Sequence, residues 1–346
     1  MARAPSPESA LTLADPPVAL RDVTSGEAGR LARLRRQLPL WLAVGATVAL
    51  GVGVLGDAPK VAAALAAFPW ALLPLVLALT CVNYGIRFVK WQLYLRLIRA
   101  PSVPRGESAL IFFSGLSMTM TPGKLGEWLK SYLLRERWRV PVGSSAPIIL
   151  AERLTDGVAM LLLALGGLLA YGYGRELLGL VALGAVGFVA VTQLPAMRGT
   201  LLGVAERLPF ARERIHHLHD FLASAQALFS PGPLTLAVAM GFVSWGAECA
   251  AFYLVLVGLG APPSGELLLQ ASFVLATSTL VGSVSMLPGG LAVAEGSIAG
   301  MLLLLRITTS PATAAAATLL IRFCTLWFGV GVGVVALFLI GRRRPA

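Results

Sequence analysis

Charged side chains interrupt the long apolar stretches of this sequence, where each one is costly unless it has a partner or a function. The candidates are Arg87, Lys124, Glu127, Glu152, Arg153, Asp156, Glu248, Glu295 and Arg322. Such groups are expected to face the interior and to pair with each other or with a polar substrate. Arginine forks match phosphate geometry, and helix N-termini offer free N–H groups to an anion. The set favours a phosphate-bearing ligand over a free cation or a neutral sugar.

Two short Pro-Gly segments break the apolar runs. The first contains Pro122 and Gly123, and the second contains Pro288, Gly289 and Gly290. Proline lacks a backbone N–H and glycine adopts conformations that other residues avoid, so a helix is expected to stop at each segment. Broken backbone at membrane depth is tolerated only where protein or a water-filled cavity covers it. We therefore expect both segments at the tips of helical hairpins beside a polar site.

The two breaks belong to a pattern that occurs twice. Each has the order Met, any residue, Pro-Gly, any residue, Leu, and then a Glu a few positions later. Arg153 follows Pro122 by 31 positions (153 − 122), and Arg322 follows Pro288 by 34 (322 − 288). Each arginine comes early in a long apolar run. This shared order predicts an internal duplication, with Arg153 and Arg322 in equivalent positions that face a central cavity near the hairpin glutamates.

The charged groups also have plainer interpretations. Arg87 and Lys90 come near the end of an apolar run, where long side chains reach up to lipid headgroups; the alternative for Arg87 is a cavity-facing position that contacts an anionic headgroup. Glu127 and Glu295 could bind a cationic headgroup, couple protons, or only cap the helices that follow the breaks. Within residues 152–156, an arginine lies beside two acids four positions apart, and these could neutralise one another.

The composition identifies the class of protein. The chain has 346 residues, 57% hydrophobic and 13% charged, with a mean hydropathy of +0.79. Soluble domains carry about 25% charged residues, so the sequence predicts a polytopic membrane protein. Its formal net charge of +11 comes from basic residues beside apolar runs, as in cytoplasmic loops, and does not indicate nucleic-acid binding. Its three cysteines lie within apolar runs and no Cys or His spacing matches a metal site, so we expect neither metal nor cofactor.

The hydropathy pattern predicts an all-α fold with about six full spans and two broken or re-entrant hairpins. Residues 1–37 are expected to form a disordered basic cytoplasmic tail, and residues 38–342 a single transmembrane domain. The expected spans are 40–56, 70–88, 147–171, 176–194, 234–259 and 312–340, with hairpins within 107–139 and 266–306. In the last span, close helix packing is expected at three glycines. These are Gly329, Gly331 and Gly333.

Residues 196–232 form a sizeable polar loop. Apolar residues recur in it every three or four positions, at Ile215, Leu218, Leu222, Ala225 and Phe229. This spacing predicts an amphipathic helix that lies on the cytoplasmic membrane surface. Its polar side carries His216, His217, His219 and Asp220. No cysteine or further acidic ligand accompanies them, so no metal site is expected there.

The lysines and arginines orient the chain. Cytoplasmic loops carry an excess of both, so the basic clusters at the two ends of the sequence predict cytoplasmic N- and C-termini. With that orientation, residues 70–172 and 233–340 form two repeats that run in opposite directions, one hairpin opening inside and the other outside. Inverted repeats with broken helices are typical of alternating-access carriers, which bind their substrate near the midplane.

Several of these features, in one order, resemble the flippase-like integral membrane family. The features are residues 83–96, 121–127, 152–156 and 287–295, and Arg322. This family is the transmembrane half of lysylphosphatidylglycerol synthases and also occurs in a free-standing form. The resemblance covers about residues 38–340. In the full-length synthases this half is held to flip aminoacylated phospholipid, while a separate soluble domain makes that lipid. No such domain is recognisable here, so we expect no aminoacyl transfer and no enzyme activity of that kind.

The resemblance and the charged residues together imply a lipid transporter in a bacterial-type cytoplasmic membrane. The expected cargo is a phosphate-bearing or aminoacylated lipid. The alternative is a membrane-embedded transferase, or an accessory protein, of lipid-linked envelope glycan or glycolipid synthesis. The expected partner is a membrane lipid and not nucleic acid; separate lipid-modifying enzymes and a second copy of the chain stay open.

Overall fold

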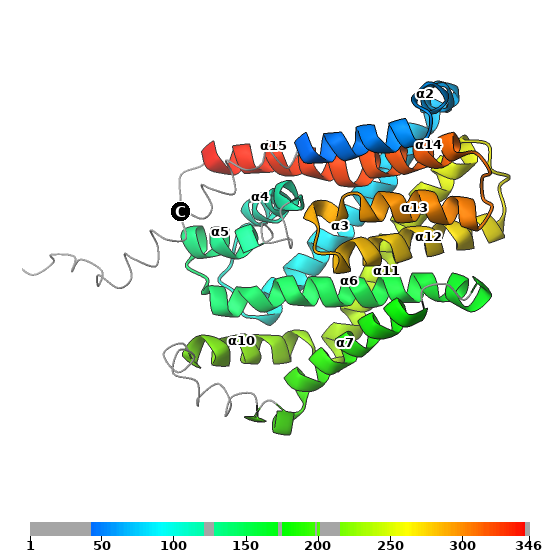
Figure 1. The fold of residues 1–346 in the computed structure, drawn as a ribbon. Coiled ribbons are helices and arrows are strands. Elements are labelled where there is room, and N and C mark those ends of the chain that lie inside the picture. Colours follow the sequence, from blue (N-terminus) through cyan, green and yellow to red (C-terminus); the bar gives the residue numbers. More distant parts are fainter. Residues whose placement is uncertain (1–42, 121–127, 172–174, 198, 201–214, 343–346) are drawn as a thin grey trace, which may run out of the picture.

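The computed structural model describes residues 43–120, 128–171, 175–197, 199–200 and 215–342. Within these ranges every regular element is a helix (Figure 1). The first half contains Ala43–Leu55, α2 (Ala58–Ala67), η1 (Trp70–Leu72), α3 (Leu73–Leu97), α4 (Arg105–Ser114), η2 (Gly115–Met118), α5 (Leu129–Trp138), α6 (Val142–Tyr171) and α7 (Arg175–Gln193). The second half contains α10 (Ile215–Leu228), α11 (Pro231–Gly258), α12 (Gly265–Val284), η4 (Pro288–Gly290), α13 (Val293–Leu304), α14 (Pro311–Arg322), η5 (Phe323–Trp327) and α15 (Phe328–Arg342).

The described helices confirm the all-α membrane class. Four of them have the length and apolar composition of a membrane span: Trp70–Leu97, Pro231–Gly258, Gly265–Val284 and Pro311–Arg342. A bent pair, Ala43–Leu55 with α2, brings the number to five if the pair forms one broken span. The predicted six full spans therefore stay a prediction, although α6, with 30 residues, is also long enough to cross a bilayer.

The first two expected spans differ from the observed helices. After Leu55 the chain turns by 96° into α2, a helix that the sequence pattern did not predict. Asp57 adopts a left-handed backbone conformation (φ 68°) and a proline opens α2, which together explain the turn. The helix α3 continues to Leu97, nine residues beyond the predicted end at Phe88. Its last turns carry charges that a hydropathy pattern alone assigns to a loop.

The second predicted hairpin is present and breaks where proline and glycine indicated. Ser264 caps the start of α12 by accepting a hydrogen bond from the Leu267 N–H (3.0 Å). After α12, Gly289 (φ 60°) and Gly290 (φ 66°) turn the chain into α13. A Cβ on Gly290 would lie 3.0 Å from the Gly282 Cα, so the returning chain passes directly against α12.

The first hairpin is described only in its two arms. Its first arm, α4, has 10 residues and is too short to span, as expected. Its tip residues, Pro122, Gly123, Lys124 and Glu127, lie outside the described residues. The second arm, α5, is fixed near its end by Arg137, which donates to the Ile340 carbonyl of α15 (2.5 Å) and pairs with Glu107 of α4 (3.7 Å).

The two hairpins enter the bundle from opposite ends. In Figure 1 the connections into α12 and out of α13 lie at the right, whereas the α5–α6 connection and the end of α15 lie at the left. The described part of the first hairpin and the break of the second line the same cavity, which is described below.

The predicted amphipathic helix exists as α10, but its apolar face contacts protein. Leu222, Ala225 and Leu228 are buried, as is Phe229 just after the helix, and α10 packs along α6. Phe229 also meets Phe188 of α7 edge-on, with ring centroids 5.0 Å apart. The apolar face therefore packs on protein, which periodicity alone could not reveal, and the position of the helix on the cytoplasmic membrane surface stays a prediction.

Two of the three glycines in the last span allow close packing, as predicted. A Cβ on Gly333 would lie 2.1 Å from the Ser117 backbone nitrogen in η2, and one on Gly329 would lie 2.4 Å from the Tyr84 hydroxyl oxygen. A Cβ on Gly331 meets nothing within 4 Å, so the prediction for this residue is wrong.

The matched glycines give a stability test. Gly333→Ala should lower the free energy of unfolding by about 1–3 kcal/mol, because its methyl group overlaps backbone that cannot move aside easily. Gly331→Ala should be neutral or slightly stabilising, since alanine favours helix and the space is open. Thermal unfolding of both variants in detergent measures the difference. Equal melting temperatures for the two variants would contradict the packing of α15 on η2.

Candidate functional site

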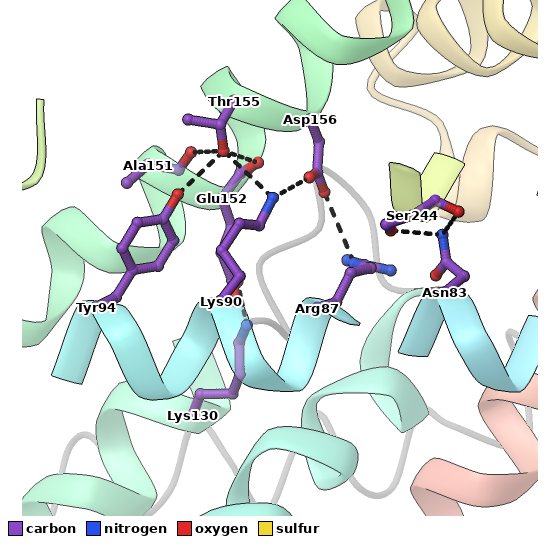
Figure 2. A network of polar contacts seen from close by, with 10 residues as sticks. All are labelled: Asn83, Arg87, Lys90, Tyr94, Lys130, Ala151, Glu152, Thr155, Asp156 and Ser244. Atoms are coloured by element: carbon purple, nitrogen blue, oxygen red, sulfur yellow. Dashed lines mark hydrogen bonds and ion pairs between the residues drawn. The ribbon is translucent and has the colours of Figure 1, made fainter. Parts of the chain in front are cut away.

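One face of α3 carries a polar stripe that points at α6 and α11. Asn83, Arg87, Lys90 and Tyr94 are spaced by four, three and four residues, which places them on one side of the helix (Figure 2). Asn83 donates both to the Ser244 carbonyl (3.0 Å) and to the Ser244 hydroxyl (2.9 Å) on α11. The stripe therefore ties the middle of α3 to its neighbour before the charged residues begin.

Asp156 of α6 is the counter-ion of this stripe. Its carboxylate accepts a short hydrogen bond from the Lys90 ammonium and lies 3.7 Å from the Arg87 guanidinium nitrogen Nε. Lys90 also donates to the Thr155 hydroxyl (3.3 Å). The Lys90 side chain is only 1% exposed, so the prediction that it reaches up to headgroups is wrong. Arg87 instead takes the cavity-facing alternative, because it lines the cavity described below.

Glu152, one turn before Asp156, pairs in the other direction. It accepts a short hydrogen bond from the ammonium of Lys130 on α5, and both side chains are buried. The same ammonium lies 5.0 Å from the ring centre of Trp91 and 5.4 Å from that of Phe112, so aromatic faces also stabilise it. The two acids thus bind cations on α3 and α5, which are partners from outside residues 152–156.

The second hairpin holds its own ion pair. The Nε of Arg322 donates to the Glu295 carboxylate (2.6 Å), and its Nη2 donates to the Gly289 carbonyl at the break (2.8 Å). Glu295 is buried in the first turn of α13. Its carboxylate binds Arg322, so the alternative in which it only caps its own helix is wrong. The predicted proximity of Arg322 to a hairpin glutamate is confirmed.

The helix geometry changes directly after Arg322. Residues Phe323–Trp327 form a π-helical segment between α14 and α15. Tyr84 of α3 donates a hydrogen bond to the Thr325 carbonyl in this segment (2.6 Å). Wide turns of this kind occur often at functional sites, since they free a carbonyl from the regular helix ladder.

These groups surround a partly open cavity of about 130 Å³ between the two hairpins. Gly115, Leu116 and Thr119 line it from the first hairpin, and Gly289, Gly290 and Ala294 from the second. Among the described residues, its charged lining consists of Arg87, Lys130, Arg153, Arg322 and Glu248. Polar side chains that also line it are Tyr84, Trp245, Thr279, Ser283 and Thr325. The lining carries an excess of cations, and beside them the indole N–H of Trp245 has no hydrogen-bond partner among the described residues.

The structure gathers most of the predicted site residues. Arg87, Arg153, Glu248 and Arg322 line the cavity, while Glu152, Asp156 and Glu295 lie behind it as counter-ions. Lys124 and Glu127 lie outside the described residues.

Sequence reasoning missed the site roles of Lys90 and Lys130. The spacing of the α3 stripe was a usable signal for Lys90, because polar residues at helical period within an apolar run indicate a buried polar face. For Lys130 no such signal existed, since it lies in a strongly basic stretch.

Apolar helices around a charged, partly open cavity define a polytopic α-helical membrane protein with a polar site inside its bundle. Residues 41–333 match the family model of the lysylphosphatidylglycerol synthase TM region, so this chain belongs to that family. The chain is also similar to a UPF0104 membrane protein of Methanothermobacter thermautotrophicus. The two are 27% identical over 274 residues, which cover 69% of this chain and 77% of the relative.

The α3–α6 ion pair predicts a large and specific loss of stability. Asp156→Asn leaves the buried Lys90 without its counter-ion and should lower the free energy of unfolding by about 3–5 kcal/mol. Asp57→Asn removes the same charge from an exposed pair with Lys60 and should change little. Thermal unfolding in detergent compares them. If the Asp156→Asn and Asp57→Asn variants have the same melting temperature, the buried ion pair does not hold α3 to α6.

Proposed function

We propose that this protein moves a phosphate-bearing lipid, anionic or zwitterionic, across the membrane without changing it chemically. The main support for this proposal is the cavity between the hairpins, which arginines from α3, α6 and α14 line together. Guanidinium groups bind phosphate oxygens in pairs, and the bordering indole N–H of Trp245 suits a further oxygen. Membership of a family named for lysylphosphatidylglycerol synthases also supports a role in lipid biology.

Alternating access gives the movement a physical route. Two hairpins that enter from opposite ends and line a shared cavity can each open one side of the site while the other stays closed. The pairing of Arg322 with the Gly289 carbonyl couples a cavity cation directly to one hairpin tip. In this proposal the two halves are inverted repeats in a cytoplasmic membrane, with both termini in the cytoplasm.

Lipid movement is tested in proteoliposomes that contain an acyl-chain fluorescent phosphatidylglycerol and a membrane-impermeant quencher. The wild type should bring probe from the inner to the outer leaflet, where it becomes quenchable. The double variant Arg322→Gln, Glu295→Gln should lose most of this movement, because the amide pair can still hydrogen-bond but no longer offers a cation. Lys60→Gln, a change at an exposed cation outside the cavity, is the matched control and should keep it.

The outcomes separate the rival functions. If wild-type protein moves the phosphatidylglycerol probe and a lipid extract from the native membrane no faster than empty liposomes, the transport proposal fails. If a donor substrate then yields a lipid-linked product, the protein is a membrane-embedded transferase. If the double variant transports like wild type, the Arg322 site is not where phosphate binds.

Cysteine labelling tests the inverted arrangement. Gly106 at the base of the first hairpin and Gly265 at the base of the second both have open space for a side chain. In a background with the exposed Cys81 replaced, Gly106→Cys should react with an impermeant maleimide only from the cytoplasmic face, and Gly265→Cys only from the opposite face. Labelling of both from one face would rule out inverted hairpins.

A further inference from the structure

Glu248 differs from the other acids of the site in its pairing. Glu152, Asp156 and Glu295 each have a salt bridge to a lysine or arginine. Glu248, in the middle of α11, is 5% exposed and lines the cavity, yet among the described residues it has neither a salt bridge nor a hydrogen bond to its carboxyl group. A buried, unpaired carboxyl group at membrane depth is costly, so its position beside the cavity calls for a function.

The surroundings of Glu248 come from several helices. The titratable and charged groups that act on it are Tyr84 and Arg87 of α3, Asp156 of α6 and Arg322 of α14. On its own helix the neighbouring Cys249 is buried. From α12, the hydroxyl-bearing residues Thr279 and Ser283 line the same cavity. Glu248 therefore faces two of the three arginines that the proposed function assigns to phosphate, Arg87 and Arg322, without being bound to either.

A carboxylate in that position competes with a phosphate. While Glu248 is ionised, its negative charge offsets the arginines and repels a second anion across a poorly screened cavity. When it accepts a proton, the repulsion disappears and its O–H becomes an additional donor for a phosphate oxygen. The site then binds an anionic headgroup best with a proton on Glu248.

We propose that Glu248 carries a coupling proton, and that proton and anionic lipid cross the membrane together in the same direction. This inference rests on the proposed function and adds that a proton gradient drives the lipid movement. The proton comes from water on the side to which the cavity is open and returns to water on the other side. One proton with one singly charged lipid moves no net charge, so a pH difference alone can drive accumulation.

The experiment uses full-length protein in phosphatidylcholine vesicles with a trace of the fluorescent phosphatidylglycerol, under an imposed pH difference. Wild type should accumulate the probe in the leaflet that faces the alkaline side, up to about tenfold for each pH unit at one proton per lipid. The direction does not depend on how the protein inserted, because each orientation follows the same gradient. Glu248→Gln should equilibrate the probe without accumulating it, whereas Glu266→Gln, at the exposed start of α12, should accumulate it like wild type.

The results separate failure of the inference from failure of the proposed function. Absence of any wild-type lipid movement refutes transport itself. If the wild type moves the probe but its final distribution between the leaflets does not depend on the pH difference, proton coupling is refuted and lipid transport is not. Accumulation by Glu248→Gln, or complete loss of its movement at every pH, shows that the carboxyl group is not the proton carrier. A dye inside the vesicles gives an independent reading on wild type alone: the lumen must acidify as probe moves inward, and an unchanged lumen overturns the inference.

Discussion

The structure depends on the pairing of charges that the membrane would otherwise exclude. Lys90 is almost fully buried, and a lone ammonium at that depth would be strongly unfavourable, so its bond to Asp156 determines which face of α3 meets α6. The contact between these two helix faces also positions the residues one turn away in α3 and in α6. With Lys90 on Asp156, Arg87 and Arg153 lie at the edge of the cavity, which Arg322 from the second half of the chain also lines. The ion pair that packs α3 against α6 therefore also positions the arginines of the site.

The second constraint is close approach at the hairpins. Tyr84 bonds to the π-helical segment, and Gly329 leaves room for its hydroxyl group, so α3 and α15 can enclose the cavity between them. At the second tip, Gly290 passes against Gly282, and Arg322 binds the carbonyl that the break exposes. The broken backbone is thus satisfied by a side chain that also faces the cavity. A ligand that engages Arg322 acts on the hairpin tip through the same guanidinium group.

The sequence was informative where a residue type has few ways to be satisfied. Proline and glycine at 288–290 predicted the break, and the order of break, acid and arginine predicted the Glu295–Arg322 pair. Prediction from the sequence failed where a side chain or helix face had several equally plausible partners. Nothing local shows that Lys130 binds an acid 22 positions away, or that the apolar face of α10 meets α6 and not lipid. The turn at Asp57 needed a left-handed residue that no pattern marks.

If the cavity arginines hold a lipid phosphate, a phosphate-bearing lipid should stay with the protein during purification. Mass spectrometry should find a phosphate-bearing lipid bound at near one per wild-type protein after extensive detergent washing. The same lipid should be depleted from the Arg322→Gln, Glu295→Gln double variant and retained by Lys60→Gln. Equal retention by all three proteins, or a bound lipid without phosphate, would contradict this account.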